Sequence, residues 1–433
     1  MDDVAKILVD YGREIFTAEK FSAAELMRRL EPMLEKRQLQ KSGNGGLARI
    51  AIIVDSAIGD FILTSPCLRE LRRLYPVSHI TLICDERVRD MAAACPYVDE
   101  VAVGPADFLE HDFAYSYPLM VQFIASHHLI ERRFDMAFVC SVYVQAYLLA
   151  YIMGARRRIA ARAPYYMSVP WGSREEWDGF ITDWLPIAAD ACHIVDRHLA
   201  VFDAMLYSPV ADRSIEAWTD QAATERAQEM LRDAGLLSEN GAAYRLIAVS
   251  VGGTVRNKQW PVASYAQLLQ RILIQQARTR FLLVGGSGDS GAASYMAGAL
   301  PRGRVYDFTG RLKLTETVAV INECSMYIGN DTGPAHIAAA CGVPVLEPNC
   351  WPREIPLQPW SFPVSFAPYQ VPSVVVLAER ALDDCRQMSG RLSGCNHSDE
   401  QHCIATITVR HVLEGFRLLC QMMAQGDSTV HYI

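Results

Sequence analysis

The sequence predicts an α/β protein made of two doubly wound domains that follow a helical extension. At 433 residues the chain exceeds what a single core usually organises. Near-continuous apolar runs, typical of buried parallel strands, alternate with helical patterns. The alternation occurs twice, each time over about the length of one domain, and is interrupted around residues 162–186. Two sheets opposed in this way are expected to bind ligands beyond the carboxyl ends of their strands, in the cleft between them.

Residues 1–48 are predicted to form the helical extension. Ala5 to Phe16 and Ala23 to Leu39 have helix-like apolar spacing, and the glycine-rich stretch Ser42–Gly46 indicates a hinge. A helical pair of this kind is typical of packing or of oligomerisation. A homo-oligomer formed through the extension is therefore one expectation.

The first domain is expected over residues 49–205 and the second over residues 206–405. The predicted strands of the first domain are Arg49–Asp55, His79–Cys84, Val98–Val103 and Phe134–Cys140, and those of the second are Tyr244–Ser250, Arg280–Gly286 and Met326–Gly329. Residues 406–433 are expected to form a C-terminal helix and tail.

Composition narrows the classes of partner. The 41 basic and 49 acidic residues give a net charge of -8, which argues against nucleic acid or an anionic membrane surface as the main partner. No apolar run is long enough to cross a bilayer, and the N-terminus lacks the layout of a secretion signal. A cytoplasmic location is expected, and with it reduced thiols for most of the 12 cysteines.

Asp60 is the candidate catalytic residue. It ends the motif Ser56-Ala57-Ile58-Gly59-Asp60, where a strand gives way to a helix. Two interpretations are open at this point. Asp60 caps the helix, which aspartate does well, or it is a general base that deprotonates an acceptor hydroxyl.

Two later loops are candidates for binding an anion. Val251–Thr254 follows a strand, and its glycines let backbone N–H groups approach an anion, with Thr254 and Lys258 adding a hydroxyl and a charge. An ordinary loop with a solvated lysine is the alternative.

The segment 330–336 also follows a strand and opens a helix, so its exposed N–H groups and the helix dipole suit an anion. Gly333 supplies the turn, and Thr332 or Asp331 is expected to cap the helix. Asp331 is itself an anion and is expected to hold the loop or to bind a sugar hydroxyl. His336 either donates to a phosphate oxygen or is a structural histidine.

Two observations concern metals. The chain contains no Asp-x-Asp pair, so a metal that bridges a nucleotide diphosphate is not expected, and no cofactor is required for catalysis. Cys385, Cys395 and Cys403 form a late cluster, with His397 and His402 nearby and Cys350 earlier. The spacings of the three cysteines fit no compact zinc knuckle. A structural metal ion and core thiols are both open interpretations.

Taken in order, these segments resemble the ADP-heptose heptosyltransferases of lipopolysaccharide synthesis, glycosyltransferase family 9, which have the GT-B fold. The likeness covers about residues 49–350 and returns at 403–416. It implies that Asp60 is the catalytic carboxylate. It also implies that the donor phosphates are bound by residues in the two later loops, namely Thr254, Lys258, Asp331, Thr332, Gly333 and His336.

The resemblance also implies inverting transfer without a catalytic metal. It implies a C-terminal helix that crosses back to the N-terminal domain, and it favours the metal interpretation of the cysteines, because some family members have such a group. One stretch departs from the pattern. Residues 346–352 read Leu-Glu-Pro-Asn-Cys-Trp-Pro where such enzymes usually have a Phe-Gly-Pro-Thr-like sequence, which leaves the donor contacts there open.

The sequence therefore predicts an inverting, metal-independent glycosyltransferase that moves a sugar, most simply heptose, from a nucleotide-diphospho-sugar such as ADP-heptose. The acceptor is expected to be a glycan, lipopolysaccharide or protein hydroxyl, including one held at a membrane surface. Two alternatives remain: a sugar-nucleotide epimerase of the same architecture, and a non-catalytic sugar-nucleotide-binding subunit. A dehydrogenase is disfavoured because the glycine-rich turn at residues 285–289 lies late in its αβ unit, whereas a dinucleotide fingerprint follows the first strand of such a unit.

Overall fold

The chain forms two compact units in a computed structural model, and each unit is described by itself. The units comprise Met1–Ala191 with Val195–Arg213, and Cys192–Ile194 with Ser214–Ile433. The structure describes residues 3–18, 22–39, 47–54, 57–109, 113–141, 143–162, 174–188, 190–238, 241–242, 244–382, 385 and 400–433. Within these residues no helix combines the length and the apolar character that crossing a bilayer requires.

The first unit runs to Arg213, beyond residue 205 at which the first domain was expected to end. The Arg213 guanidinium pairs with Asp196 at 3.0 Å and with Asp203 at 3.2 Å. Asp203 also accepts a hydrogen bond from the backbone N–H of Val210. These contacts tie the residues after the last helix of this unit to that helix, so the boundary falls later than the composition suggested.

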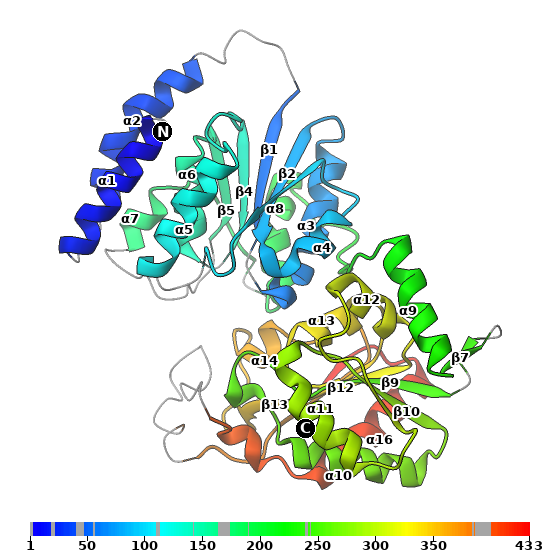
Figure 1. Cartoon of the computed structure of the whole chain (residues 1–433). Helices are drawn as coiled ribbons and strands as arrows, with labels where there is room; N and C mark the ends of the chain where they lie inside the picture. Colours follow the sequence, from blue (N-terminus) through cyan, green and yellow to red (C-terminus); the bar gives the residue numbers. More distant parts are fainter. Residues whose placement is uncertain are drawn as a thin grey trace. The chain divides into compact units, whose positions relative to one another are not determined.

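A fully parallel six-stranded sheet forms the centre of the first unit (Figure 1). Its strands are β1 (Arg49–Val54), β2 (His79–Asp85), β3 (Glu100–Gly104), β4 (Met136–Cys140), β5 (Arg157–Ala161) and β6 (Asp183–Leu185). The spatial order is β3-β2-β1-β4-β5-β6, which is that of a Rossmann-type sheet. The predicted α/β class is confirmed. Because the order reverses between β1 and β4, ligands are expected beyond the carboxyl ends of these strands.

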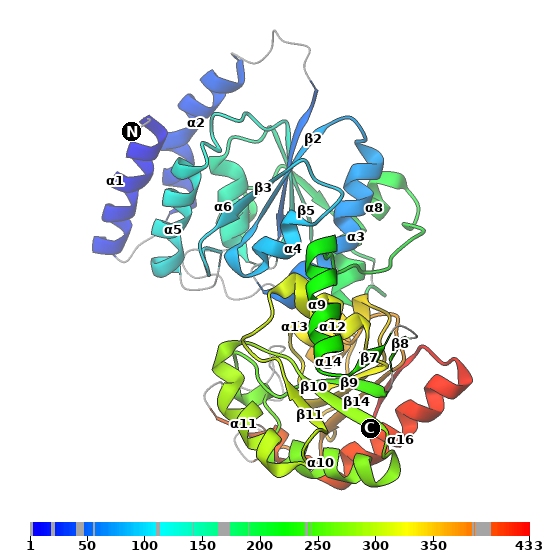
Figure 2. The same ribbon diagram turned by 45° about the vertical axis from the view of Figure 1, so that its right-hand side comes forward.

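Helices cover both faces of this sheet (Figures 1 and 2). One layer consists of α3 (Ile58–Leu74), α4 (Arg89–Ala93) and α8 (Ile194–Leu206), with η1 (Glu86–Val88) before α4, and the other of α5 (Phe113–Ser126), α6 (Val144–Ile152) and α7 (Arg174–Asp178). Alternate residues of each strand face opposite layers. Phe138 of β4, for example, stacks on Phe202 of α8 with ring centroids 5.6 Å apart, whereas its neighbours Ala137 and Val139 join the core under α5 and α6.

The N-terminal extension packs on the α5 and α6 side of the first unit. It forms α1 (Asp3–Ala18) and α2 (Ala23–Leu39), close to the predicted spans. Leu8, Leu26 and Leu30 are fully buried in the same core as the α5 and α6 residues. Part of the apolar surface that suggested an oligomer contact is therefore covered within the chain itself. The predicted hinge lies outside the described residues.

Strand β5 was missed because arginines begin it. Arg158 is paired internally: its guanidinium donates to the backbone carbonyls of Phe180 and Ala155, the latter at 2.7 Å. Arg157 pairs with Asp183 of the neighbouring β6 at 2.8 Å. A charged strand at the side of a sheet carries no apolar run, so periodicity does not reveal it.

The second unit is built around a seven-stranded parallel sheet. Its strands are β9 (Arg245–Ser250), β10 (Thr279–Leu283), β11 (Val305–Asp307), β12 (Met326–Gly329), β13 (Val345–Pro352), β14 (Ser373–Ala378) and β15 (Val430–Tyr432), and β7 (Leu237–Ser238) pairs separately with β8 (Gly241–Ala242). The spatial order is β11-β10-β9-β12-β13-β14-β15. This repeats the order of the first sheet and adds one strand, with the reversal between β9 and β12.

Two layers of helices cover the second sheet (Figures 1 and 2). One contains α10 (Val262–Gln275), α11 (Ser290–Ala299) and α16 (Val409–Gln425), and the other α9 (Gln221–Asp233), α12 (Leu314–Asn322) and α13 (Gly333–Ala340). Shorter helices in the connections are η2 (Arg256–Lys258), η3 (Ser287–Asp289), α14 (Phe362–Ser365) and η4 (Cys403–Thr406). Strand β12 has its predicted ends, Met326–Gly329.

The C-terminal helix packs within the second unit, and its expected contact with the N-terminal domain stays a prediction. Phe416 and Leu419 of α16 are buried in the core of the second unit, against α10 and β14. After α16 the chain forms β15, which pairs in parallel with β14 through Ser373–Val430 and its neighbours. Residues 406–433 therefore belong to the second unit.

Candidate functional site

The two predicted anion-binding loops lie side by side at the switch point of the second sheet. Residues 251–258 follow β9, and residues 330–333 follow β12, its neighbour in the sheet. This is the place at which doubly wound sheets bind ligands. Lys258 and Asp331 are 73 residues apart in the sequence, and the parallel pairing of β9 with β12 brings them together.

Asn330 joins the two loops. Its buried side-chain amide donates to the backbone carbonyls of Val251 and Gly252, each at 3.0 Å. Its side-chain oxygen accepts from the N–H of Trp260 at 3.0 Å and from the hydroxyl of Tyr265 at 2.8 Å. All hydrogen-bonding atoms of the amide are thus used to hold the loops together, which is a positioning role that sequence reasoning had not assigned.

Close approach explains two glycines of the first loop. A Cβ atom on Gly252 would lie 1.8 Å from a carboxylate oxygen of Asp289, and one on Gly253 would lie 3.0 Å from the side chain of Thr332. A larger residue at position 252 would collide with Asp289 of η3, and one at position 253 would press on Thr332 of the second loop. Thr254, predicted to bind phosphate, is exposed beside this contact.

Lys258 and Asp331 form an ion pair across the two loops, which the sequence did not predict. The Lys258 amine lies 2.9 Å from a carboxylate oxygen of Asp331 and 4.1 Å from the ring centroid of Phe362. Burial alone would lower the pKa of Lys258, but the charge and hydrogen bond of Asp331 outweigh it and raise that pKa. Lys258 is therefore a fixed cation, and its carboxylate partner holds it in the site.

Helix α13 starts at Gly333, and Thr332 occupies its N-cap position. The expected side-chain cap is absent among the described residues, because the Thr332 hydroxyl donates instead to the backbone carbonyl of Asn330 at 3.3 Å. The first turn therefore keeps backbone N–H groups that no side chain caps. Such groups and the helix dipole favour a bound anion.

His336 lies one turn into α13 and is buried. Burial lowers the pKa of His336 to about 4, against the opposing charge of Asp331. The ring is therefore neutral near pH 7 and can donate one hydrogen bond but carries no charge toward a phosphate. Its Nε2 atom lies 3.9 Å from Asp331, and its Nδ1 atom has no hydrogen-bond partner in the described part of the chain.

Glu347 is a buried acid of this neighbourhood that the sequence analysis did not select. It belongs to β13, is 2% exposed and interacts electrostatically with both Asp331 and Lys258. The family resemblance had marked residues 346–352 as a stretch whose donor contacts were open, but it assigned no role to Glu347. Only the strand order places it in this neighbourhood.

Asp60, the candidate general base, belongs to the first unit, whereas the candidate donor-binding residues belong to the second. It lies in the first turn of α3, directly beyond β1, at the switch point of the first sheet. The N-cap position is taken by Ala57, so Asp60 is not the capping residue. Ser56 of the same motif lies outside the described residues.

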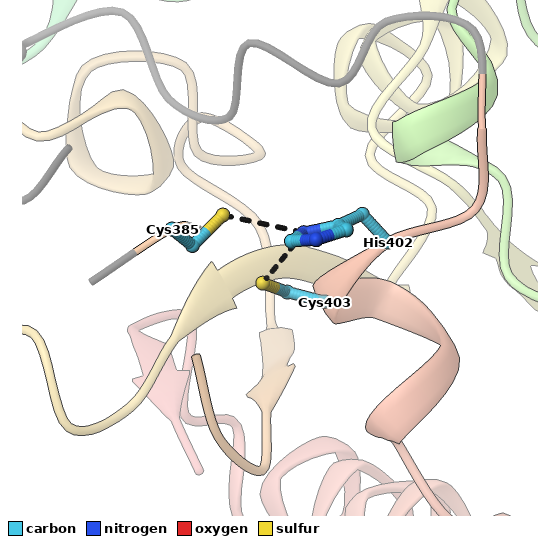
Figure 3. Close-up of side chains that lie close together, drawn as sticks. All are labelled: Cys385, His402 and Cys403. Carbon is cyan, nitrogen blue, oxygen red and sulfur yellow. Dashed lines mark hydrogen bonds between the residues drawn. The ribbon is translucent and has the colours of Figure 1, made fainter. Parts of the chain in front are cut away.

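A second cluster lies in the second unit, away from these loops in sequence. Figure 3 shows Cys385 and Cys403 directed at the ring of His402, with both sulfur atoms 3.3 Å from His402 Nδ1. All three side chains are buried, and their ligand atoms lie within 4.8 Å of one another. His402 thus joins the predicted group, whereas Cys395 lies outside the described residues.

This geometry fits a metal ion. Tetrahedral zinc with its usual bond lengths places sulfur and nitrogen ligands about 3.5 Å apart, close to the observed separations. The backbone N–H of Leu382 also points at Cys403 Sγ, 3.5 Å away, as outer partners of metal-bound thiolates do.

Comparison with known proteins adds family information. Residues 125–347, just over half of the chain, match the profile of Glycosyltransferase family 9 (heptosyltransferase). Lipopolysaccharide heptosyltransferase 2 of Salmonella typhimurium is 22% identical over 309 residues, or 69% of this chain and 81% of the relative. Lipooligosaccharide heptosyltransferase 2 of Haemophilus ducreyi is 24% identical over 307 residues, or 68% of this chain and 81% of the relative.

Solved structures share the fold. A family 9 glycosyl transferase from Veillonella parvula matches with a TM-score of 0.64 at 20% identity, covering 86% of this chain and 97% of the other. The Escherichia coli ADP-heptose lps heptosyltransferase II matches with a TM-score of 0.61 at 19% identity, covering 87% and 99%. These likenesses support a GT-B arrangement of two Rossmann-like halves.

Proposed function

The chain belongs to glycosyltransferase family 9, and from that premise we propose that it transfers heptose from ADP-heptose to an acceptor hydroxyl, with inversion and without a catalytic metal. The observation that carries the proposal is the anion site between Lys258 and the start of α13, at the switch point of the second sheet. The heptosyltransferase names of the relatives support heptose as the sugar.

In this proposal the second unit holds the leaving group. Lys258 and the N–H groups at the start of α13 stabilise the negative charge that develops on the departing diphosphate. Thr254, Thr332 and Gly333 line the same loops, and neutral His336 offers a hydrogen bond. Asp331 fixes the lysine before the donor arrives, so little reorganisation is needed when charge develops.

Asp60 supplies the base. It takes the proton of the acceptor hydroxyl as that oxygen attacks the anomeric carbon and the bond to the diphosphate breaks. The attack from the face opposite the diphosphate inverts the anomeric centre. We propose a glycan, lipopolysaccharide or protein hydroxyl as the acceptor, and the lipopolysaccharide enzymes among the relatives favour a glycan of that kind.

The donor assignment is tested by thermal stability in the presence of nucleotides. A ligand at about 100 times its dissociation constant stabilises the folded state by about 2.7 kcal/mol, which corresponds to roughly 5–10 °C for a domain of this size. We expect ADP and ADP-heptose to raise the melting temperature by that amount, with UDP and GDP at equal concentration as controls. A larger shift with UDP or GDP would contradict the adenine assignment. Consumption of the donor without acceptor would indicate an epimerase.

We also propose that Cys385, His402 and Cys403 hold a structural metal ion. Two sulfurs and one imidazole are a donor set that favours Zn²⁺, which binds such ligands tetrahedrally. The ion would join Cys385 to the start of η4 and would take no part in the transfer. Its fourth ligand is not among the described residues.

Elemental analysis of the purified protein tests this site. We expect about one equivalent of metal per chain, and a loss of most of it in His402→Ala and Cys403→Ser. Cys341→Ser, which changes a half-buried cysteine of the same unit, serves as the control and should keep its metal. We also expect a chelator to lower the melting temperature of the wild type by about 5 °C or more. A metal-free protein with unchanged stability would leave core thiols as the explanation.

A further inference from the structure

The donor loops contain a buried carboxyl group that the proposed transfer does not use. Glu347 is 2% exposed, and its Oε1 atom accepts a hydrogen bond from the Asn349 side-chain amide at 2.8 Å. Its Oε2 atom is buried and has no hydrogen-bond partner within the described residues. Folded proteins rarely leave such an atom unpaired, because the free energy lost on removing it from water is then not offset by a hydrogen bond. A hydrogen bond to a ligand oxygen would offset it.

Strand pairing places Glu347 at the site. Strands β12 and β13 pair with Ile328 beside Leu346, so the next residue along β13, Glu347, lies beside Gly329. Asp331 lies two residues after Gly329 in the sequence. Strand β13 also packs against η2, which ends in Lys258. Glu347 is therefore next to the ion pair that marks the anion site.

Burial and the neighbouring charge of Asp331 favour the protonated form of this carboxyl group. Burial raises the pKa of Glu347 well above its usual range, and the charge of Asp331 adds to the effect, whereas the Asn349 hydrogen bond and Lys258 oppose it without reversing it. Lys258 can neutralise only one of the two carboxyl groups, Asp331 and Glu347. It pairs with Asp331, whose Oδ2 atom lies 2.9 Å from the lysine Nζ atom. Since Oε1 accepts from Asn349, the proton belongs on Oε2. The unpaired atom is thus an O–H donor.

We propose that Glu347 is a further donor-binding residue, whose Oε2–H donates a hydrogen bond to an oxygen of the nucleotide-sugar diphosphate. The inference rests on the proposed function, since it requires a diphosphate at these loops. A neutral acid suits that place, because it donates to an anion that a carboxylate would repel. Residues 346–352 are also where this chain departs from the usual family sequence, so the contact would be particular to this chain.

Two variants of equal size test the contact. Glu347→Gln keeps a neutral donor, whereas Glu347→Met keeps the volume and loses every polar atom. By calorimetry near pH 7, we expect ADP to bind Glu347→Gln within about twofold of the wild type. We expect Glu347→Met to bind it about 10- to 100-fold more weakly, since hydrogen bonds to charged groups are worth that much. Equal ADP affinity of the wild type and Glu347→Met would overturn the proposal.

The same experiment separates this inference from the proposed function. A wild type that binds ADP while Glu347→Met binds it equally well refutes only the role of Glu347. A wild type that binds neither ADP nor ADP-heptose refutes the donor assignment, and the present inference with it. Melting curves without ligand show whether each variant is folded.

A pH series tests the proton itself. In the unfolded chain Glu347 ionises near pH 4.3, whereas burial raises its pKa in the folded protein. Wild-type stability should therefore fall relative to Glu347→Gln as the pH rises from about 5 to 7. A constant difference would mean that Glu347 is ionised in the folded protein and would overturn the proposal. The other titratable groups that act on this neighbourhood are present in both proteins; they are Lys258, Asp331, His336, Tyr265, Tyr327, Cys350 and Tyr432.

Discussion

Replacing Asp60 with asparagine is expected to reduce the turnover number for heptosyl transfer by about 100-fold or more, with donor affinity unchanged. A positioned general base contributes about 10²- to 10⁴-fold to a rate, and asparagine keeps the shape of the side chain but cannot accept the proton. Donor affinity should persist because the residues that we propose to bind the phosphates belong to the second unit. Single-turnover transfer and calorimetry with ADP measure the two quantities separately.

A control is needed because Asp60 also lies in the first turn of α3, where a negative charge favours the helix dipole by about 0.3–1 kcal/mol. Asp90→Asn removes a first-turn carboxylate from α4 of the same unit, where the side chain is exposed. We expect both variants to lose similarly little stability, and only Asp60→Asn to lose transfer. Near-normal turnover of Asp60→Asn would place the base elsewhere.

Replacing Lys258 with alanine is expected to weaken ADP binding by about 100-fold. The substitution removes the cation of the anion site. It also leaves Asp331, whose side chain is 8% exposed, as a buried negative charge without its partner. Both effects weaken the binding of a diphosphate. Removing one partner of a buried ion pair also lowers the stability of the folded protein by about 3–5 kcal/mol. Calorimetry with ADP at fixed ionic strength measures the change.

Two further variants separate these effects. Arg256→Ala removes an exposed cation from the same short helix η2 and should change ADP affinity by less than about threefold. Lys258→Ala combined with Asp331→Asn removes the lone buried charge, and it should recover stability without recovering ADP affinity. If the double variant bound ADP as tightly as the wild type, the lysine would not contact the phosphate.

Most of the fold could be predicted because the patterns that specify it are local. The apolar run of β12 and the glycine before α13 lie within ten residues of the structures that they form. The same holds for β9 and α10. Charged strand β5 and the terminal strand β15 could not be predicted in this way, since neither carries an apolar run.

The site could be predicted as a set of residues but not as an arrangement. Sequence motifs selected Lys258 and Asp331, yet their ion pair joins residues 73 positions apart. Loop patterns suggested a cap at Thr332, and the structure uses its hydroxyl elsewhere. The sequence placed His402 near the cysteines but did not select it as a ligand, although its Nδ1 atom lies 3.3 Å from the sulfur atoms of both Cys385 and Cys403.

The sequence by itself therefore determined the class of fold, the succession of its main strands along the chain and the loops that could bind a diphosphate. Those features follow from periodicity, turn residues and helix starts, which act over a few residues. Only the tertiary structure decided which charges are paired and which acids are neutral. The pKa of His336 and of Glu347 depends on burial and on the charge of Asp331, and both come from strands and loops that meet only after the sheet has formed.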